Sequence, residues 1–449
     1  MSILNLLKDF LHWLFYTTFY AWELVNDEIR NVDGTSMVAR DGPGFLWFNN
    51  KFWILGGWNT NMAEEWKKNN PNYHPDAIPL ESEFILSYTT NEIWSSPDAL
   101  SWTLEASHYS NTPTPDKIDP VTGVDPITGQ KARWRPRHAA GWIVHEHLQK
   151  KYLYVIGGDD EDGTEFGNMY SMPGGAYPRD VWRSLDGTNW ELVTQDAEPF
   201  RPEVTAPLDP GSTYGRTLHA VGSHNGKLWV FGGAINLGDG VELDAAQHPI
   251  VAPGDKETKV HPLDDLWSSD DGGKTWTRRA VSSVQRPSPR GLIYTLVSWR
   301  GDLWLCGGGT YHPYDELRTY YNDVWHYNEA KDQWFRIFMP KTDVGSDSWE
   351  AREYHNVIVF DDKLWVMSGT SGGPNGYPRG SSQGNRNDVW FSKNGVYWEQ
   401  LKSDVIWEPG HADGVCVNDA GLWHAGGNGT FANHKVDVWV LRAHRTFRI

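Results

Sequence analysis

Five arginines recur along the chain at the start of short apolar segments, and their chemistry would suit an anionic ligand. The series, with a histidine at the next interval, is Arg40, Arg137, Arg216, Arg290, Arg352 and His411. A guanidinium group matches a carboxylate with two parallel hydrogen bonds. If the fold gathers the six segments around one axis, the side chains form a cationic ring that selects an acidic ligand. Packing at strand entry is the alternative interpretation of the same series.

Polar residues beside this series supply candidate acids, bases and ligand contacts. Three candidate catalytic residues follow the fifth arginine: Glu353, Tyr354 and His355. A carboxylate or an imidazole at this place can remove a proton or protonate a leaving oxygen, while the arginines hold the carboxylate of a sugar. The predicted ligand-binding set contains, besides the series itself, Trp58, His138 and His219.

Metal chemistry has weak support in the sequence. The acidic run Asp159–Asp162 and the group formed by His261, Asp264 and Asp265 offer oxygen ligands to Ca²⁺. Neither has the alternating spacing of a known calcium loop, so we interpret both as solvated loops. Two cysteines in the whole chain cannot build a cysteine zinc site or a disulfide framework. We therefore predict no metal site and no cofactor.

The composition excludes other classes of protein. The 449 residues include 58 acidic and 40 basic side chains, for a formal net charge of −18, so no basic stripe is available for nucleic acid. The chain also has 26 tryptophans and 45 glycines. This richness in aromatic residues, with 22% charged residues, is atypical of a disordered chain or a coiled coil.

An internal repeat predicts the elements that position the candidate residues. A Gly-Gly pair follows an apolar strand five times, as in KFWILGG and KLWVFGG, and Ser368-Gly369 is a sixth, degraded copy. A second strand ending in tryptophan follows each pair, as in RDVW and NDVW, and in five repeats a further tryptophan comes eight or nine residues later. With the apolar strand that precedes each pair, the pattern predicts six units of four strands, which is a β-propeller. Nearly all the tryptophans are then expected to pack between blades.

The two ends of the chain suggest how the ring closes. The sixth unit lacks a fourth strand after Trp439, whereas the segment Trp22–Val25 resembles the fourth strand of the second unit. We therefore predict that an N-terminal strand completes the last blade. Before it, apolar and polar residues alternate with a helical period, so residues 1–20 are predicted to be an amphipathic helix or anchor and residues 21–449 the propeller. This segment has no signal-peptide pattern and is too polar to span a bilayer.

The Gly-Gly and paired-aromatic pattern resembles the kelch-repeat family over residues 22–449. The run Ser269–Trp276 (SDDGGKTW) is similar to the Asp-box turn of sialidase-type propellers, with shorter relatives at Ser184–Trp190 and Ser392–Trp398. The resemblance implies a six-bladed all-β fold and offers two enzyme precedents, sialic acid epimerases and lyases of acidic polysaccharides. Galactose oxidase, a kelch-type copper enzyme, is a poor match, because the segment at Arg40 lacks the tyrosine that its cysteine crosslink requires.

Two functions follow from the sequence. The first is a ligand-recognising propeller that binds a glycan or another polar or anionic surface through its long loops and the arginine ring, with a protein partner at the N-terminal helix. The alternative is an enzyme on an acidic carbohydrate, of epimerase, mutarotase, lyase or glycosidase type, with Glu353 or a histidine as acid–base group. A cytoplasmic or virion location is expected, with no nucleic-acid partner and no membrane span.

Overall fold

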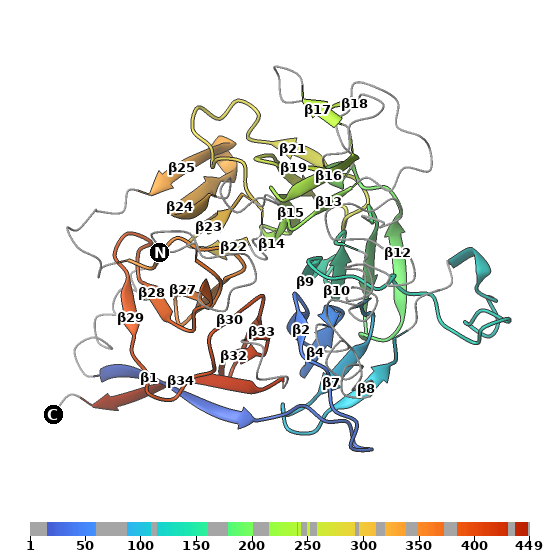
Figure 1. Ribbon diagram of the computed structural model, residues 1–449, viewed down its shortest axis with the longest axis horizontal. Coiled ribbons are helices and arrows are strands. Elements are labelled where there is room, and N and C mark those ends of the chain that lie inside the picture. The colour runs from blue at the N-terminus through green and yellow to red at the C-terminus, as the bar shows by residue number, and fades with distance from the viewer. Residues whose placement is uncertain are drawn as a thin grey trace, which may run out of the picture.

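Six four-stranded antiparallel sheets form a ring of propeller blades (Figure 1). This computed structural model describes residues 16–59, 88–108, 115–159, 178–200, 215–239, 241–243, 249–251, 258–291, 296–310, 319–337, 348–371, 384–429 and 436–447. Over these ranges the chain is all-β, and its short helical turns are 3₁₀: η2 (Pro115–Lys117), η3 (Glu198–Phe200) and η5 (Glu329–Lys331). The predicted fold class, an all-β propeller of six four-stranded blades, is confirmed for this part of the chain.

Within blades 1 to 5 the strands lie in the order of the sequence, from the centre of the ring outwards. Blades 1 to 3 are β3 (Gly44–Phe48), β4 (Lys51–Leu55), β7 (Ile93–Ser96), β8 (Thr103–Ala106); β9 (Gly141–His147), β10 (Lys150–Ile156), β11 (Val181–Ser184), β12 (Trp190–Thr194); and β14 (Ala220–His224), β15 (Lys227–Phe231), β20 (Leu266–Ser269), β21 (Thr277–Arg279). Blades 4 and 5 are β22 (Val297–Trp299), β23 (Asp302–Gly309), β24 (Tyr320–Asn328), β25 (Gln333–Ile337); and β26 (Asn356–Phe360), β27 (Lys363–Met367), β28 (Val389–Ser392), β29 (Glu399–Leu401). The first strands of neighbouring blades contact one another around the ring.

The sixth blade is built from both ends of the chain. It contains β31 (Gly414–Asn418), β32 (Gly421–Ala425), β34 (Val438–Phe447) and β1 (Tyr16–Asn26). Strand β1 runs antiparallel to β34, with Trp22 opposite Leu441 and Leu24 opposite Trp439 (Figure 1). The predicted closure by an N-terminal strand is therefore confirmed.

The predicted helix over residues 1–20 is wrong for residues 16–20, because these residues are part of β1. Neighbouring side chains differ in their surroundings, as a strand requires: the ring of Tyr20 lies 5.0 Å from that of Trp365 in the neighbouring blade, whereas Phe19 is half exposed. Residues 1–15, the rest of that prediction, lie outside the described residues. Within the described ranges no helix is long and apolar enough to cross a membrane.

Apolar clusters fill the space between every pair of adjacent blades. One cluster joins Phe48 and Trp53 of blade 1 to Trp142 and Trp182 of blade 2, and five similar clusters lie around the ring. A four-stranded blade cannot bury both of its faces alone, so the large flat side chains pack against the next blade. The sequence predicted that the repeated tryptophans pack between blades. This prediction is confirmed for the tryptophans that belong to the six clusters.

The Gly-Gly pairs lie where one blade meets the next. Gly56 has a φ of +59°, and a Cβ atom there would lie 2.6 Å from the Trp142 ring and 2.9 Å from the carbonyl oxygen of Arg137 in blade 2. Only glycine accepts this conformation and this close approach without strain. In blade 5 the first glycine is replaced by Ser368, which keeps the left-handed conformation at φ +56°.

Beyond the glycine pairs, short ladders extend the blades on one face of the ring. They comprise β2 (Arg40–Asp41), β5 (Trp58–Asn59) and β6 (Tyr88–Thr89); β13 (Arg216–Thr217), β16 (Ala234–Asp239) and β19 (Thr258–Pro262); β30 (Gly410–His411) and β33 (Asn428–Gly429); and the separate hairpin of β17 (Val241–Leu243) and β18 (Pro249–Val251). Strands β2, β30 and β33 lie near the centre of the ring (Figure 1). These ladders carry four of the candidate site residues: Arg40, Trp58, Arg216 and His411.

The turn with the Asp-box resemblance lies at the far end of its strand from these ladders. The Asp271 carboxylate accepts hydrogen bonds from the backbone N–H groups of Lys274 and Thr275, each at 3.0 Å, and Trp276 Nε1 donates to the Gly273 carbonyl at 3.1 Å. These bonds tie the turn between β20 and β21 to itself.

Candidate functional site

Each of the five arginines is the centre of a clamp inside its own blade. The guanidinium groups are at most 2% exposed, and each pairs with a carboxylate two residues before the tryptophan of the third strand. The pairs are Arg40–Glu92, Arg137–Asp180, Arg216–Asp265, Arg290–Asp323 and Arg352–Asp388. The same carboxylate accepts a hydrogen bond from that tryptophan, so one acidic side chain ties the first strand to the third.

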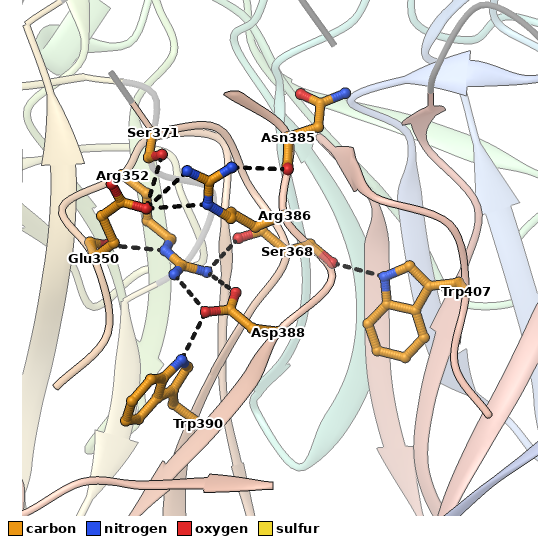
Figure 2. A network of polar contacts seen from close by, with 9 residues as sticks. All are labelled: Glu350, Arg352, Ser368, Ser371, Asn385, Arg386, Asp388, Trp390 and Trp407. Atoms are coloured by element: carbon orange, nitrogen blue, oxygen red, sulfur yellow. Dashed lines mark hydrogen bonds and ion pairs between the residues drawn. The ribbon is translucent and has the colours of Figure 1, made fainter. Parts of the chain in front are cut away.

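Figure 2 shows the clamp of blade 5. Arg352 Nη1 and Nη2 donate to the two carboxylate oxygens of Asp388 at 2.5 and 2.9 Å, and Nη1 also donates to the carbonyl oxygen of Ser368 at 2.9 Å. Trp390 Nε1 donates to Asp388 Oδ2 at 2.7 Å. The carbonyl at the first position of the Gly-Gly pair is bound in the same way in the other four clamps. The guanidinium therefore joins the segments next to the ends of β26, β27 and β28.

The clamps change the electrostatic interpretation of the arginine series. Burial alone would raise the pKa of Glu92, Asp265, Asp323 and Asp388, but the charge and hydrogen bonds of the paired arginine outweigh it and lower each pKa. These four carboxylates are thus ionised at neutral pH, and each offsets the positive charge of the guanidinium group that it pairs with. The sequence predicted a ring of positive charge at these arginines. The ion pairs correct that prediction, because each guanidinium is buried against a carboxylate.

The sixth member of the series is displaced by one residue. The carbonyl oxygen of Gly410 accepts a hydrogen bond from Gly369 N at 3.0 Å, as that of Arg352 does from Gly308 N at 3.1 Å. The residue two positions further has a positive φ in both blades, +55° at Tyr354 and +56° at Ala412. Gly410 therefore occupies the arginine position, and His411 corresponds to the residue after the arginine.

The positions directly after the arginines bring polar side chains together at the centre of the ring. Their order from blade 5 through blades 6, 1 and 2 is Glu353, His411, Asp41 and His138. We call these four residues the polar arc. Blades 3 and 4 carry the small residues Thr217 and Gly291 at this position. The arc thus covers one side of the ring and joins four separate blades.

His411 holds the middle of the polar arc. Its Nδ1 lies 2.9 Å from Asn385 Oδ1, and its Nε2 lies 3.5 Å from Asp41 Oδ2. Burial alone would lower the pKa of His411, but the hydrogen bond and charge of Asp41 outweigh it, with help from the charges of Asp413 and Glu353, and raise the pKa. An imidazolium that donates on both nitrogens fits these two oxygen partners.

Aromatic rings flank both ends of the arc. The Tyr354 ring lies 5.3 Å from that of His411, and the Trp58 ring lies 6.2 Å from that of His138. Burial lowers the pKa of His138, although the charge of Asp41 opposes this effect, so the His138 ring is neutral at physiological pH. The arc therefore combines two carboxylates, one histidine that favours its charged form and one neutral histidine.

His219 and His355 lie apart from the arc. Their Nε2 atoms hydrogen-bond the backbone carbonyls of Ile156 at 3.1 Å and Cys306 at 2.8 Å, each in the preceding blade. Burial, with the charge of the nearby Arg216 or Arg352, lowers the pKa of each to about 3. A neutral histidine that bonds a neighbouring strand ties two blades together and does not serve as an acid at neutral pH.

Sequence reasoning overlooked Asp41, Asn385 and the carboxylates of the clamps. The clamp carboxylates had a signal, because an acidic residue stands two positions before the third-strand tryptophan in all six repeats. The sequence signal for Asp41 was weaker, because it was only its position directly after Arg40. Asn385, which pairs with His411, follows residues 372–383, which lie outside the description, and its spacing gave no signal.

The acidic run Asp159–Asp162, which we interpreted as a solvated loop, falls mostly outside the described residues, since among its members only Asp159 is described. Asp265 of the second acidic group pairs with Arg216. Among the described residues no three His, Cys, Asp or Glu side chains are arranged to hold a metal ion. The long loops that the sequence favoured for ligand contact are largely outside the same ranges.

Comparison with known proteins adds no family to these observations. No protein-family model matches the chain, and no curated protein matches it. The six four-stranded blades remain consistent with a kelch-type propeller.

Proposed function

We propose that this protein is a ligand-binding propeller that holds a hydroxyl-rich ligand, a glycan, at the polar arc. The observation that supports the proposal is the meeting of Glu353, His411, Asp41 and His138, each from the same position of a different blade. Side chains that meet at the centre from four blades suit a small set of directional polar contacts.

The chemistry of the arc fits sugar hydroxyl groups. The carboxylates of Glu353 and Asp41 accept hydrogen bonds from hydroxyls, and His411 holds the Asp41 carboxylate in place. The indole of Trp58 offers a flat apolar surface to the C–H face of a sugar ring. Because the arginine charges are already cancelled within the clamps, we propose a neutral sugar in preference to an acidic one.

The test is saturation-transfer NMR of the full chain with galactose, N-acetylglucosamine, glucuronic acid and N-acetylneuraminic acid in one tube. We expect transfer to a neutral sugar that is lost in Glu353→Gln and in Trp58→Ala. The matched control is Glu191→Gln, because Glu191 is an exposed carboxylate on the outer strand β12. Transfer to no sugar, transfer to the acidic sugars alone, or transfer that survives both site variants would contradict the proposal.

An enzyme is the second candidate, and the position of His411 between Asp41 and Glu353 favours it. A histidine flanked by two carboxylates can supply one group that donates a proton and another that accepts it. An enzyme would give new product signals in the same tube, and Glu353→Gln would abolish them. A binding protein would leave the sugar spectra unchanged over the same time.

A further inference from the structure

Blade 6 lacks the arginine of the clamp but keeps its carboxylate. Gly410 stands at the arginine position and has no side chain to reach across the blade. Asp437 nevertheless accepts a hydrogen bond from Trp439 Nε1 at Oδ2, at 2.7 Å, as Asp388 does from Trp390. The Asp437 carboxylate is therefore held by its tryptophan as in the clamps, and among the described residues no guanidinium of blade 6 pairs with it.

A cavity of about 140 Å³ lies beside this carboxylate. Gly410, Gly426 and Asp437, which correspond to the three parts of the clamp, all line it. Its volume is several times the roughly 10–15 Å³ that a single water requires. The position that a guanidinium fills in five blades is thus a cavity in the sixth.

The walls of the cavity favour a cation. Its described lining contains four acidic residues and no lysine or arginine; the acidic residues are Asp27, Glu408, Asp413 and Asp437. Asp27 and Glu408 are exposed, which places negative charge where the cavity reaches the surface. Burial, together with the charge of Asp413, raises the pKa of Asp437, although His424 and Trp439 oppose the shift. The charge of a bound cation would counteract this rise and favour the ionised Asp437 carboxylate.

His424 gives an independent sign that the cavity takes a ligand. The residue is 1% exposed and lines the cavity, and its Nδ1 has no hydrogen-bond partner. Its Nε2 lies 3.0 Å from Asp413 Oδ2, but the two atoms do not form a hydrogen bond. The ring stacks on Trp407 with centroids 3.8 Å apart. A buried polar atom without a partner is costly unless something in the cavity satisfies it.

We propose that this cavity binds a guanidinium group in the place that arginine side chains occupy in the other five blades. Two nitrogens donate to the carboxylate oxygens of Asp437, and one also donates to the Gly426 carbonyl, as Arg352 does to Asp388 and Ser368 (Figure 2). A free guanidinium compound and an arginine side chain of a protein partner share this chemistry. The planar fork distinguishes both from an ammonium group, which is a point charge.

The experiment measures the melting temperature of the full chain and its binding heat with methylguanidinium, with the tripeptide Gly-Arg-Gly, and with methylammonium as the ammonium control. We expect a saturable rise in melting temperature with methylguanidinium and none with methylammonium. A response to the tripeptide as well assigns the site to arginine side chains, whereas a response to methylguanidinium alone assigns it to small compounds. Both responses support the proposal.

Two variants locate the effect. Asp437→Asn removes the charge and should weaken binding at least about tenfold. Gly410→Arg restores the clamp and should abolish binding, and Gly410 has no positive φ that would forbid a side chain. Asp419→Asn is the matched control, an exposed aspartate in the turn between β31 and β32.

Several results would overturn the proposal. These are no response to either guanidinium probe, an equal response to methylammonium, or a response that Asp437→Asn leaves unchanged. Lys435 stands two residues before Asp437 in the sequence. A response that appears only after Lys435→Ala would mean that the chain supplies its own cation, and it too would reject the site as one for an external ligand.

Discussion

At the scale of single residues, the same side-chain type serves different ends according to its register in the repeat. Arginine at the first position is buried against a carboxylate, and the residue after it faces the centre of the ring. His411 and His355 were both candidate site residues, yet one faces Asp41 and the other bonds the carbonyl of Cys306 in the preceding blade. A displacement of one or two positions therefore separates a site residue from a structural one.

The buried clamps should be major contributors to stability. Arg290→Met leaves the Asp323 carboxylate buried without its partner, so we expect the free energy of unfolding to fall by about 3–5 kcal/mol. Denaturant unfolding of the variant measures the loss. The surface pair Lys393–Glu399, 3.9 Å apart with both side chains about two-thirds exposed, provides the control. Lys393→Met should change stability by less than about 1 kcal/mol, and an equal effect at the two sites would refute the clamp interpretation.

At the scale of elements, strand β1 is an outer strand joined to the ring from the other end of the chain. It covers the outer edge of β34, and Trp22 packs edge-on against Trp407 with centroids 4.6 Å apart. The blade without β1 would expose both the unpaired backbone of β34 and the apolar surface of the cluster that it shares with blade 5. Ring closure and the completion of blade 6 are thus the same event.

Removal of β1 should abolish cooperative folding. A chain that begins at Asn26 lacks the strand, whereas a chain that begins at Tyr16 keeps it and serves as the control. Circular dichroism on heating should show a sharp transition for the longer chain and none for the shorter. A synthetic peptide of residues 16–26 should restore the transition in trans. If the two chains melted alike, the closing role of β1 would be excluded.

At the scale of the whole molecule, carboxylates of several clamps share the same shift in pKa, and their effects on stability act together. The pKa of Glu92, Asp265, Asp323 and Asp388 is lowered in the folded protein by the paired arginines. A lowered folded-state pKa contributes stability that is complete above the unfolded-state value of about 4 and is lost as the pH falls through the folded-state value. The protein should therefore be most stable near neutrality and unfold in acid.

This pH dependence has a direct test in Asp388→Asn. The free energy of unfolding of the wild type should fall steadily below about pH 4. The variant lacks one of the titrating groups, so its deficit relative to the wild type should be largest near pH 7 and shrink in acid. Denaturant titrations at pH 7, 5, 4 and 3 measure both curves. A deficit that stays constant over this range would mean that the pair contributes no linked stability.

The periodic features of the sequence were sufficient to predict the fold. The strand runs, the glycine pairs, the repeated tryptophans and the missing last strand each depend on local spacing, and they indicated six four-stranded blades closed by the segment that starts near Trp22. The helix predicted over residues 16–20 was wrong because that segment is apolar enough to satisfy either period. Its long-range partner, β34, decides that it forms a strand.

The contacts of the site depended on tertiary structure. Arg352 and Asp388 are 36 residues apart, and His411 and Asp41 come from the last and first blades, so their pairing exists only once the ring is closed. The sequence by itself determined which residue types recur and at what interval, because strand period and turn chemistry are local. Only the tertiary structure decided that the arginine charges are cancelled, that the polar arc joins four blades and that blade 6 keeps a carboxylate without its arginine. Burial and charge pairing between distant residues are properties of the closed ring.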